Sequence, residues 1–213
     1  MATMGSMQGQ RSYGGVSGDE RAARRRRQLL DAGLSIFGSR GYRTATVREV
    51  CREAKVADRY FYDEFHGMEE LLIAVYTECL DRLEAAVADT LGSSDALSEK
   101  VRPGLESFLT VVADDPRLAR VVWFEVLGVS PIVEQTYLGR MARFGELLVG
   151  ASLHPLALPR ALQPWVGSAL IGGISHVVMT WVAGGLAAPR DDVLDALEIF
   201  LDSVAARISP EDT

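Results

Sequence analysis

Residues 46–65, TVREVCREAKVADRYFYDEF, decide the fold that we expect for this chain. Thr46 offers a hydroxyl to the free amides of a helix start, and Glu49, three residues later, completes a capping-box pattern. A second short helix is expected from Asp58, which can cap it, to about Phe65. Two short helices separated by a tight turn predict a helix–turn–helix unit.

Helical patterns flank this stretch on both sides. Before it, residues 19–37 are rich in helix formers and carry one apolar stripe, with Gly38 and Gly41 as the expected stop signals. After it, a long amphipathic helix is expected to end near Leu91. The rest lacks an alternating strand pattern of useful length, so we expect an all-α fold of about nine helices. The further helices are expected over residues 96–114, 116–127, 131–150, 160–184 and 191–208.

Composition excludes several classes of protein. The chain has 213 residues, 48% of them hydrophobic, which supports a globular core. Its two cysteines form no CxxC pair, and no secretion signal is recognisable, so a reducing cytoplasm is the expected location. Glycines and a histidine interrupt the most apolar stretch, residues 165–188, which suits a buried helix better than a membrane span. Residues 1–18, rich in Gly, Ser and Gln, are expected to be a disordered leader.

Charge is distributed unevenly along the chain. Residues 1–66 carry 12 Lys and Arg against 8 Asp and Glu, whereas residues 67–213 carry 10 against 21. The net charge of −7 argues against a protein that coats nucleic acid with its whole surface. A basic N-terminal part on an acidic remainder is expected if only that part meets a polyanion.

The spacing of these residues resembles the DNA-binding region of the TetR family of transcriptional regulators. The resemblance covers about fifty residues and is carried by Arg27, Leu30, Gly33, Ile36, Phe37, Gly41, Tyr42, Ala45, Thr46, Val47, Val50, Cys51, Ala54, Val56, Arg59, Phe61, Tyr62, Phe65, Glu69, Leu71 and Leu72. It implies an all-helical homodimeric repressor, with a DNA-binding domain at residues 19–66 and a ligand-binding and dimerisation domain at residues 67–213. The chain departs from the family pattern at Met68, Lys55, Ala57 and Glu64, which affects the expected set of DNA contacts.

In a helix–turn–helix, the second helix lies in the major groove of a DNA operator and other side chains bind phosphates. Phe61 and Phe65 are needed to bury this helix. We therefore expect the groove-facing residues to be Asp58, Arg59 and Tyr60, with Arg59 on a guanine edge. The expected phosphate contacts are Thr46, Arg48, Tyr62 and, from the arginine run of residues 21–27, Arg25. Alternatively, the arginine run is only a solvated face, and Tyr62 is only core packing.

Aromatic and methionine residues of the acidic part are either core or the lining of an effector cavity. The candidates for binding a small, largely apolar effector are Trp123, Phe124, Glu125, Tyr137, Met141, Phe144, His176 and Met179. Glu125 stands in an apolar run and needs a partner, for which Arg140 or Arg143 is the alternative to a ligand. His176 is either a satisfied core histidine or a ligand anchor.

Small residues of the penultimate expected helix, at residues 167–169, 172–173 and 184–185, favour close approach of another helix. Together with the apolar residues of the last helix, they fit a four-helix dimer interface, or else packing within one chain. A dimer would place two recognition helices about 34–36 Å apart, at successive major grooves.

Two functions are compared: a ligand-responsive repressor, released from a palindromic operator by its effector, and a helical enzyme or small-molecule carrier whose basic part is incidental. The sequence shows no Ser/His/Asp order, phosphate-binding glycine loop or HExxH pair. The three histidines are too scattered to imply a metal site, and no cofactor is expected.

Overall fold

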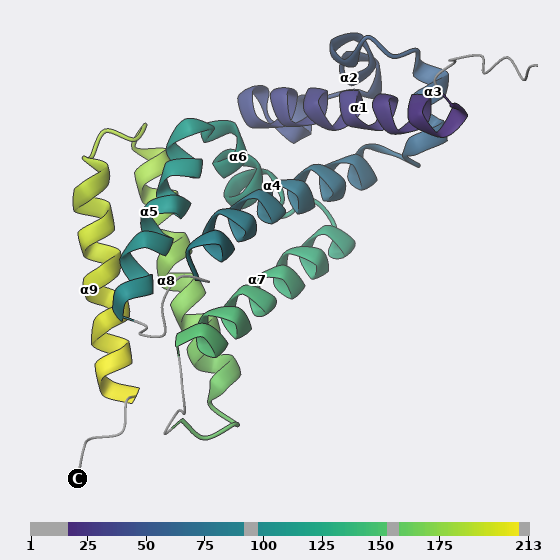
Figure 1. Cartoon of the computed structure of the whole chain (residues 1–213). Helices are drawn as coiled ribbons and strands as arrows, with labels where there is room; N and C mark the ends of the chain where they lie inside the picture. Colours follow the sequence, from purple (N-terminus) through teal and green to yellow (C-terminus); the bar gives the residue numbers. More distant parts are fainter. Residues whose placement is uncertain (1–16, 92–97, 153–157, 209–213) are drawn as a thin grey trace, which may run out of the picture.

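The computed structural model describes residues 17–91, 98–152 and 158–208, and all regular secondary structure within them is helical. In chain order the elements are α1 (Gly18–Arg40), the 3₁₀ turn η1 (Tyr42–Thr44), α2 (Val47–Ala54), α3 (Asp58–Glu64), α4 (Met68–Leu91), α5 (Ser98–Asp114), α6 (Pro116–Arg120), the π-helix η2 (Val121–Glu125), α7 (Pro131–Ser152), α8 (Gln163–Ala183) and α9 (Arg190–Ile208). Helices α1–α3, here called the head, gather at one end, and α4–α9, the body, form the rest (Figure 1). Over the described residues, the expected all-α fold is confirmed.

Helix α1 joins the head to the body. Ser17 and Glu20 form a capping box at its start, so helical structure begins at Gly18, inside the expected leader; the leader's residues 1–16 lie outside the described part. The helix runs through Gly38, which was expected to end it, and stops at Arg40 before Gly41, whose φ is 93°. It packs against α2 and α3 on the head side and against α4, α6 and η2 on the body side.

The helix–turn–helix is formed by α2 and α3. The capping box of Thr46 and Glu49 is confirmed: Thr46 Oγ1 accepts from the Glu49 amide at 3.3 Å, and Glu49 Oε2 accepts from the Thr46 amide at 3.0 Å. The expected cap of α3 is wrong, because the N-cap position is held by Ala57 and no side chain caps it. Asp58 is instead the first helical residue. Lys55 closes the turn in the left-handed conformation, with φ 55°.

Residues 116–127, expected as one helix, form two elements. The short helix α6 passes directly into η2, in which the backbone is π-helical over five residues. A π-helical segment shifts the angular position of every side chain after it, and such segments are frequent at functional sites. The shift is important here because Trp123 and Glu125 both lie in η2.

The glycines of α8 have different roles. The backbone of Gly167 lies against that of Gly145 on α7, because a Cβ built on Gly145 would be 2.8 Å from the Gly167 carbonyl carbon. A Cβ on Gly173 would be 2.9 Å from Phe200 of α9, whereas a Cβ on Gly172 would meet no atom within 4 Å. The alternative of packing within one chain therefore holds at Gly167 and Gly173, and the face that carries Gly172 is open.

Helix α8 is long and apolar enough to cross a membrane by length and composition alone, and among the described residues it is the one helix that is so. Its side chains Leu170, Ile174, Val178 and Trp181 are buried in the protein. The helix packs against α7 and α9. These contacts give its hydrophobic composition a role in the core of the body.

The contact between Gly145 and Gly167 gives a paired stability test on α7. Gly145→Ala should lower the free energy of unfolding by about 1–3 kcal/mol, because the added methyl group meets backbone atoms that cannot move aside. Gly139→Ala, on the same helix but with no atom within 4 Å, should raise it by about 0.5–1 kcal/mol, the gain expected in helix propensity. Thermal unfolding followed by circular dichroism measures both, and equal changes in the two variants would contradict the close approach of α7 and α8.

Candidate functional site

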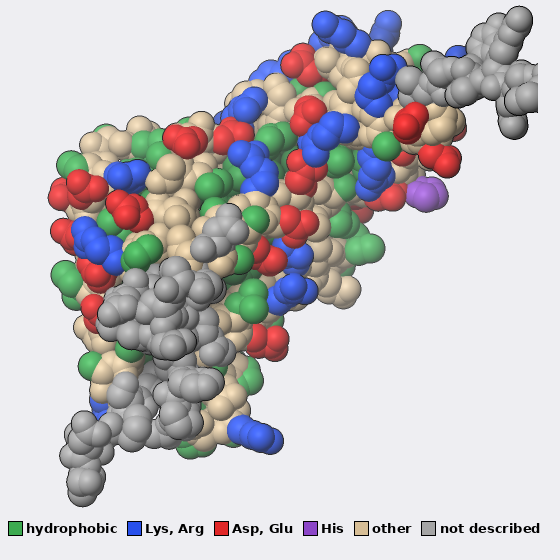
Figure 2. All heavy atoms as spheres, viewed as in Figure 1, with side chains coloured by type: hydrophobic (Ala, Val, Ile, Leu, Met, Phe, Trp, Pro, Cys, Tyr) green, Lys and Arg blue, Asp and Glu red, His purple; other side chains and the backbone are tan. Residues whose placement is uncertain are grey.

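The outer surface of the head carries several of the expected DNA contacts. Arg48 on α2 and Asp58, Arg59 and Tyr62 on α3 are exposed, and 63% of Tyr62 is accessible. Phe61 and Phe65, on the opposite side of α3, are fully buried. Figure 2 shows Lys and Arg side chains over this end of the molecule. The helix that was expected to enter the groove therefore presents polar groups outward while its aromatic residues hold it in the head.

Tyr60 is half-buried rather than freely exposed, because two arginines hold its ring. The guanidinium carbon of Arg25 lies 4.5 Å from the ring centroid and that of Arg59 lies 4.6 Å from it. Arg59 also donates to the Tyr60 hydroxyl at 2.9 Å. Cation–π stacking uses the face of a guanidinium and not its N–H groups; in this cluster Arg59 Nη2 donates to Tyr60 and Arg25 Nε is buried without a partner. The structure thus brings these three expected residues together in one cluster that joins α1 to α3.

Other arginines of the run are engaged within the chain, which the sequence reasoning missed. Arg26 stacks on Phe65 at 4.5 Å and donates to the Glu64 carbonyl at 3.2 Å. Arg27 forms ion pairs with Asp31 at 2.7 Å and Glu78 at 2.6 Å. The i,i+4 spacing of Arg27 and Asp31 was a visible signal for the first pair. Part of the run is therefore structural rather than a free cationic surface.

Thr46 and Asp58 both have contacts inside the head. The Thr46 hydroxyl lies 2.9 Å from Glu49 Oε2 as part of the capping box. Asp58 lies beside the buried Cys51 thiol. Burial, together with the nearby Asp58 carboxylate, raises the pKa of Cys51 to about 11. Cys51 is accordingly a protonated, unreactive core residue at neutral pH.

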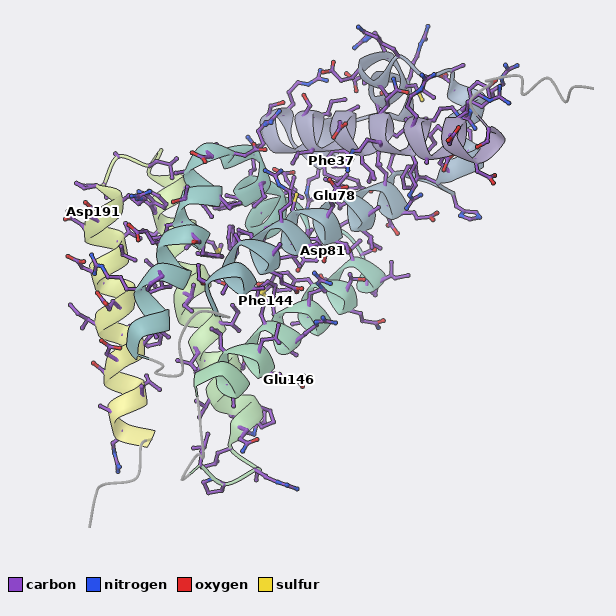
Figure 3. All side chains as sticks on the ribbon, viewed as in Figure 1. Phe37, Glu78, Asp81, Phe144, Glu146 and Asp191 are labelled. Carbon is purple, nitrogen blue, oxygen red and sulfur yellow. The ribbon has the colours of Figure 1, made fainter. Side chains whose placement is uncertain are left out.

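The body contains a cavity of about 660 Å³ between α4, α5, α7 and α8. Its lining is mainly apolar and includes Leu83, Leu105, Phe108, Trp123, Phe144 and Ile174. Polar groups at the lining are Asp81, Glu84, Glu146 and Ser175. Figure 3 shows Phe144 projecting from α7 toward α4, which carries Asp81. A partly open apolar cavity with a few polar groups is typical of a small-molecule site.

Three of the eight expected effector-binding residues line this cavity, namely Trp123, Met141 and Phe144. The other five do not line it. Phe124 is 37% exposed, Tyr137 packs on Tyr76 with ring centroids 6.4 Å apart, and Met179 is half-buried against the core. The family resemblance implied a cavity among helices 4 to 8, but the sequence reasoning named no lining residue of α4 or α5, such as Leu80 and Leu105. The available sequence signal was the apolar face of α4, which is wider than a single stripe of apolar residues on a helix.

Glu125 has a partner different from those expected. Its carboxylate accepts from Arg120 Nε at 2.9 Å and from the Tyr42 backbone amide at 2.7 Å, so it faces the head. The expected partner Arg140 lies 2.5 Å from Asp81 and 3.1 Å from Glu84 at the cavity lining. The π-helical backbone of η2 explains the error, since straight-helix spacing assigns the wrong side to residues that follow the extra residue in the turn.

His176 is exposed and lines a second, shallower hollow of about 460 Å³ between α8 and α9. It is therefore neither a core histidine nor a group in the main cavity. Over the described ranges, no cluster of three or more His, Cys, Asp or Glu side chains is placed to hold a metal ion.

Comparison with known proteins agrees with this architecture. Residues 29–75 match the family described as "Bacterial regulatory proteins, tetR family". The "HTH-type transcriptional activator FasR" of Mycolicibacterium smegmatis is 29% identical over 99 residues, which are 46% of this chain and 45% of that protein. The "Fatty acid metabolism regulator protein" of Bacillus subtilis is 24% identical over 185 residues, which are 80% of this chain and 92% of that protein.

Solved structures show the same fold. The fatty acid degradation regulator FadR of Bacillus halodurans superposes with a TM-score of 0.70 at 20% identity, covering 83% of this chain and 94% of that one. FadR of Bacillus subtilis, solved in complex with stearoyl-CoA, gives a TM-score of 0.65 at 18% identity, covering 82% of this chain and 96% of that one. The matched proteins are regulators of transcription, so the alternative of an enzyme is not supported. Residues 29–75 therefore carry the DNA-binding region of the TetR family of bacterial transcriptional regulators, and the described chain has the fold of these solved regulators.

Proposed function

We propose that this chain is a homodimeric repressor that binds a palindromic operator and is released by a small, largely apolar effector. Residues 19–66 are proposed as the DNA-binding domain and residues 67–213 as the ligand-binding and dimerisation domain. Because the target is chromosomal DNA, the proposed location is the cytoplasm, without a membrane partner. One observation carries the DNA-binding part: α3 buries Phe61 completely while it exposes Arg59.

The proposed DNA contacts divide into base contacts and phosphate contacts. Asp58, Arg59 and Tyr60 occupy the first three positions of α3, the end of a recognition helix that meets base edges. The phosphate contacts are assigned to Arg25, Thr46, Arg48 and Tyr62. Arg48 is exposed and forms no ion pair with a described residue, so its guanidinium is available to a phosphate.

The proposed effector is a long aliphatic molecule. The cavity of about 660 Å³ is lined mainly by apolar side chains, which favours a hydrocarbon chain over a polar ligand. Two similar proteins are named for fatty acid regulation, and one of them was solved with stearoyl-CoA. These observations support a fatty acyl chain as the part of the effector that enters the cavity beside Trp123, Met141 and Phe144.

The proposed dimer interface is the outer face of α8 and α9. Trp165 on α8 is 75% exposed and Ile199 on α9 is 67% exposed, which is unusual for such large apolar side chains. On the same face, Gly172 has open space around it and His176 is exposed. A second copy packed here would bury these residues in a four-helix arrangement about a two-fold axis.

Substitutions at two arginines should separate base contacts from phosphate contacts. On a duplex selected by the wild-type protein from random sequences, Arg59→Ala should lower the preference for the correct base at one position by about 5- to 150-fold, the loss of one bidentate contact. Arg48→Ala should weaken all duplexes alike and reduce the slope of log K against log salt by about 1. Fluorescence anisotropy at several salt concentrations measures both. Identical effects of both substitutions on selected and random duplexes would refute this assignment.

Filling the cavity should weaken the response to effector without affecting DNA binding. Ala88 lines the cavity from α4, so Ala88→Phe should occupy part of the space for the acyl chain. With dodecanoic acid and stearoyl-CoA as probes, operator release should need at least about tenfold more probe, the effect of about 1.4 kcal/mol lost in binding. Ala142→Phe, on an exposed position of α7 outside the lining, is the matched control. The proposal fails if wild type responds to a probe and Ala88→Phe responds equally.

A charge on the α8–α9 face should separate the dimer. Ile199→Asp places a carboxylate in the proposed interface and should shift the protein to half its wild-type mass in sedimentation, with loss of binding to the full palindrome. Leu138→Asp on α7, where the wild-type side chain is 63% exposed, tests the same change on another face and should leave the mass unchanged. If Ile199→Asp remained a dimer and Leu138→Asp became a monomer, the dimer interface would lie on α7 instead.

A further inference from the structure

The junction between α1 and α2 is held by the body as well as by the head. Where α1 ends, the Ser39 carbonyl accepts a hydrogen bond from Arg120 Nη1 at 3.1 Å. Three residues later, the Tyr42 amide donates to Glu125 Oε2 at 2.7 Å. Two body side chains therefore bind the two free backbone ends at this junction, a carbonyl at a helix C-terminus and an amide at the start of η1.

Arg120 and Glu125 also bind each other, so the three contacts form one unit. Arg120 Nε donates to Glu125 Oε1 at 2.9 Å, and only 12% of the Glu125 side chain is exposed. A carboxylate so shielded from water needs both of its donors, and the Tyr42 amide loses its acceptor when the carboxylate moves. The unit therefore favours a single position of the head on the body.

The backbone conformation at Gly41 leaves room for the Arg120–Glu125 pair. Gly41 adopts φ 93°, a conformation that disfavours other residues, and a Cβ there would lie 3.1 Å from Glu125 Oε2. A neighbouring hydrogen bond also holds this junction to the body: Arg43 Nη2 donates to the Gly128 carbonyl at 3.1 Å. The absence of a side chain at Gly41 thus lets the Glu125 carboxylate approach the backbone where α1 turns toward the helix–turn–helix.

The same five-residue π-helix that carries Glu125 also forms part of the cavity lining. Trp123, which is 3% exposed, lines the cavity and packs edge-on against Phe108, with ring centroids 6.1 Å apart at 83°. Only one residue separates Trp123 from Glu125. A molecule that displaces the indole must move η2 or the cavity wall around it, because the neighbouring Val121 and Val122 are fully buried and closely packed.

We propose that the Arg120–Glu125 pair positions the head for operator binding, and that an effector lodged against Trp123 acts on the DNA-binding helices by displacing Glu125 from the Tyr42 amide. The effector half rests on the proposed function; the positioning half does not. Glu125 is a positioning residue, since it acts through the Tyr42 backbone and touches neither DNA nor the cavity. Coupling between two sites of one protein is commonly about 5- to 150-fold in affinity, and this is the range expected here.

The first test needs neither DNA nor effector. Hydrogen exchange of peptides that contain the Tyr42 amide should be at least about tenfold faster in Glu125→Ala than in wild type, since the amide loses its acceptor. Glu125→Gln should restore most of the protection, because its amide oxygen still accepts. Glu106→Ala on α5, which removes a carboxylate 4.0 Å from Arg190, is the matched control and should leave this exchange unchanged. Unchanged exchange in Glu125→Ala overturns the proposal.

The second test measures positioning on DNA. Wild type should discriminate between its selected palindrome and the same palindrome with two base pairs inserted between half-sites. Glu125→Ala should reduce this discrimination at least about fivefold, because the head is no longer held in one position. If the substitution only destabilises the protein, it will weaken binding to both duplexes equally, and that result would overturn the proposal. The response to effector is the ratio of the operator Kd with dodecanoic acid or stearoyl-CoA to the operator Kd without it. This ratio should be at least fivefold smaller in Glu125→Ala than in wild type. The Kd with which the variant binds the probe itself should change less than twofold.

Failure of the two ideas is distinguishable. A wild-type protein that no probe releases contradicts the effector part of the proposed function, and the exchange and spacing results still decide on Glu125. A wild-type protein that responds, combined with a Glu125→Ala variant that responds equally, leaves the proposed function intact and overturns the coupling. The Arg120→Ala, Glu125→Ala double variant should add little to either single variant, because the pair acts as a unit.

Discussion

Helix α1 must be buried on two sides at once, and the arrangement of head and body depends on this constraint. Leu29, Ile36 and Phe37 are buried in the core that head and body share, and two glycines of the same helix let the body come close to it. A Cβ on Gly33 would lie 2.8 Å from Val75 of α4, and a Cβ on Gly38 would overlap the backbone of Arg117 at α6. Close packing of this kind transmits displacement, because a dense interface has few intermediate arrangements. A shift of α4 or α6 is therefore a shift of the helix on which α2 and α3 rest.

The arginines of α1 show why a charged run is not simply a charged surface. Arg25 and Arg26 stack on aromatic rings of the head, and Arg27 binds carboxylates on α1 and α4. Arginine combines a planar face with several fixed donors, so one side chain can hold α3 in place and still offer an edge to a phosphate. The stacking of Arg25 and Arg59 on Tyr60 links α1 to α3, so the orientation of α3 depends on the same side chains that are proposed to contact DNA.

The sequence predicted local structure well where a local rule sufficed. The capping box at Thr46 and the amphipathic spacing of α4 depend on neighbours three or four residues away, and both were visible. The cap at Asp58, the partner of Glu125 and the role of Phe124 were wrong or incomplete for a common reason. Each depends on the turn geometry of a particular segment: Ala57 holds the N-cap of α3, and the π-helix rotates the residues of η2. A straight-helix pattern contains no signal for an extra residue in one turn.

The position of the cavity gives the effector two routes to the head. One follows α4, which lines the cavity near its C-terminal half and begins, at Met68, only a short turn after α3 ends. The other follows η2, which passes from Trp123 in the lining to Glu125 at the junction of α1 and η1. The first route tilts a long rigid helix, and the second releases a hydrogen bond that fixes the head. Since both begin at the same apolar space, the proposed coupling has an effector move the head by displacing Glu125 from the Tyr42 amide, while α4 links the same space to the end of α3.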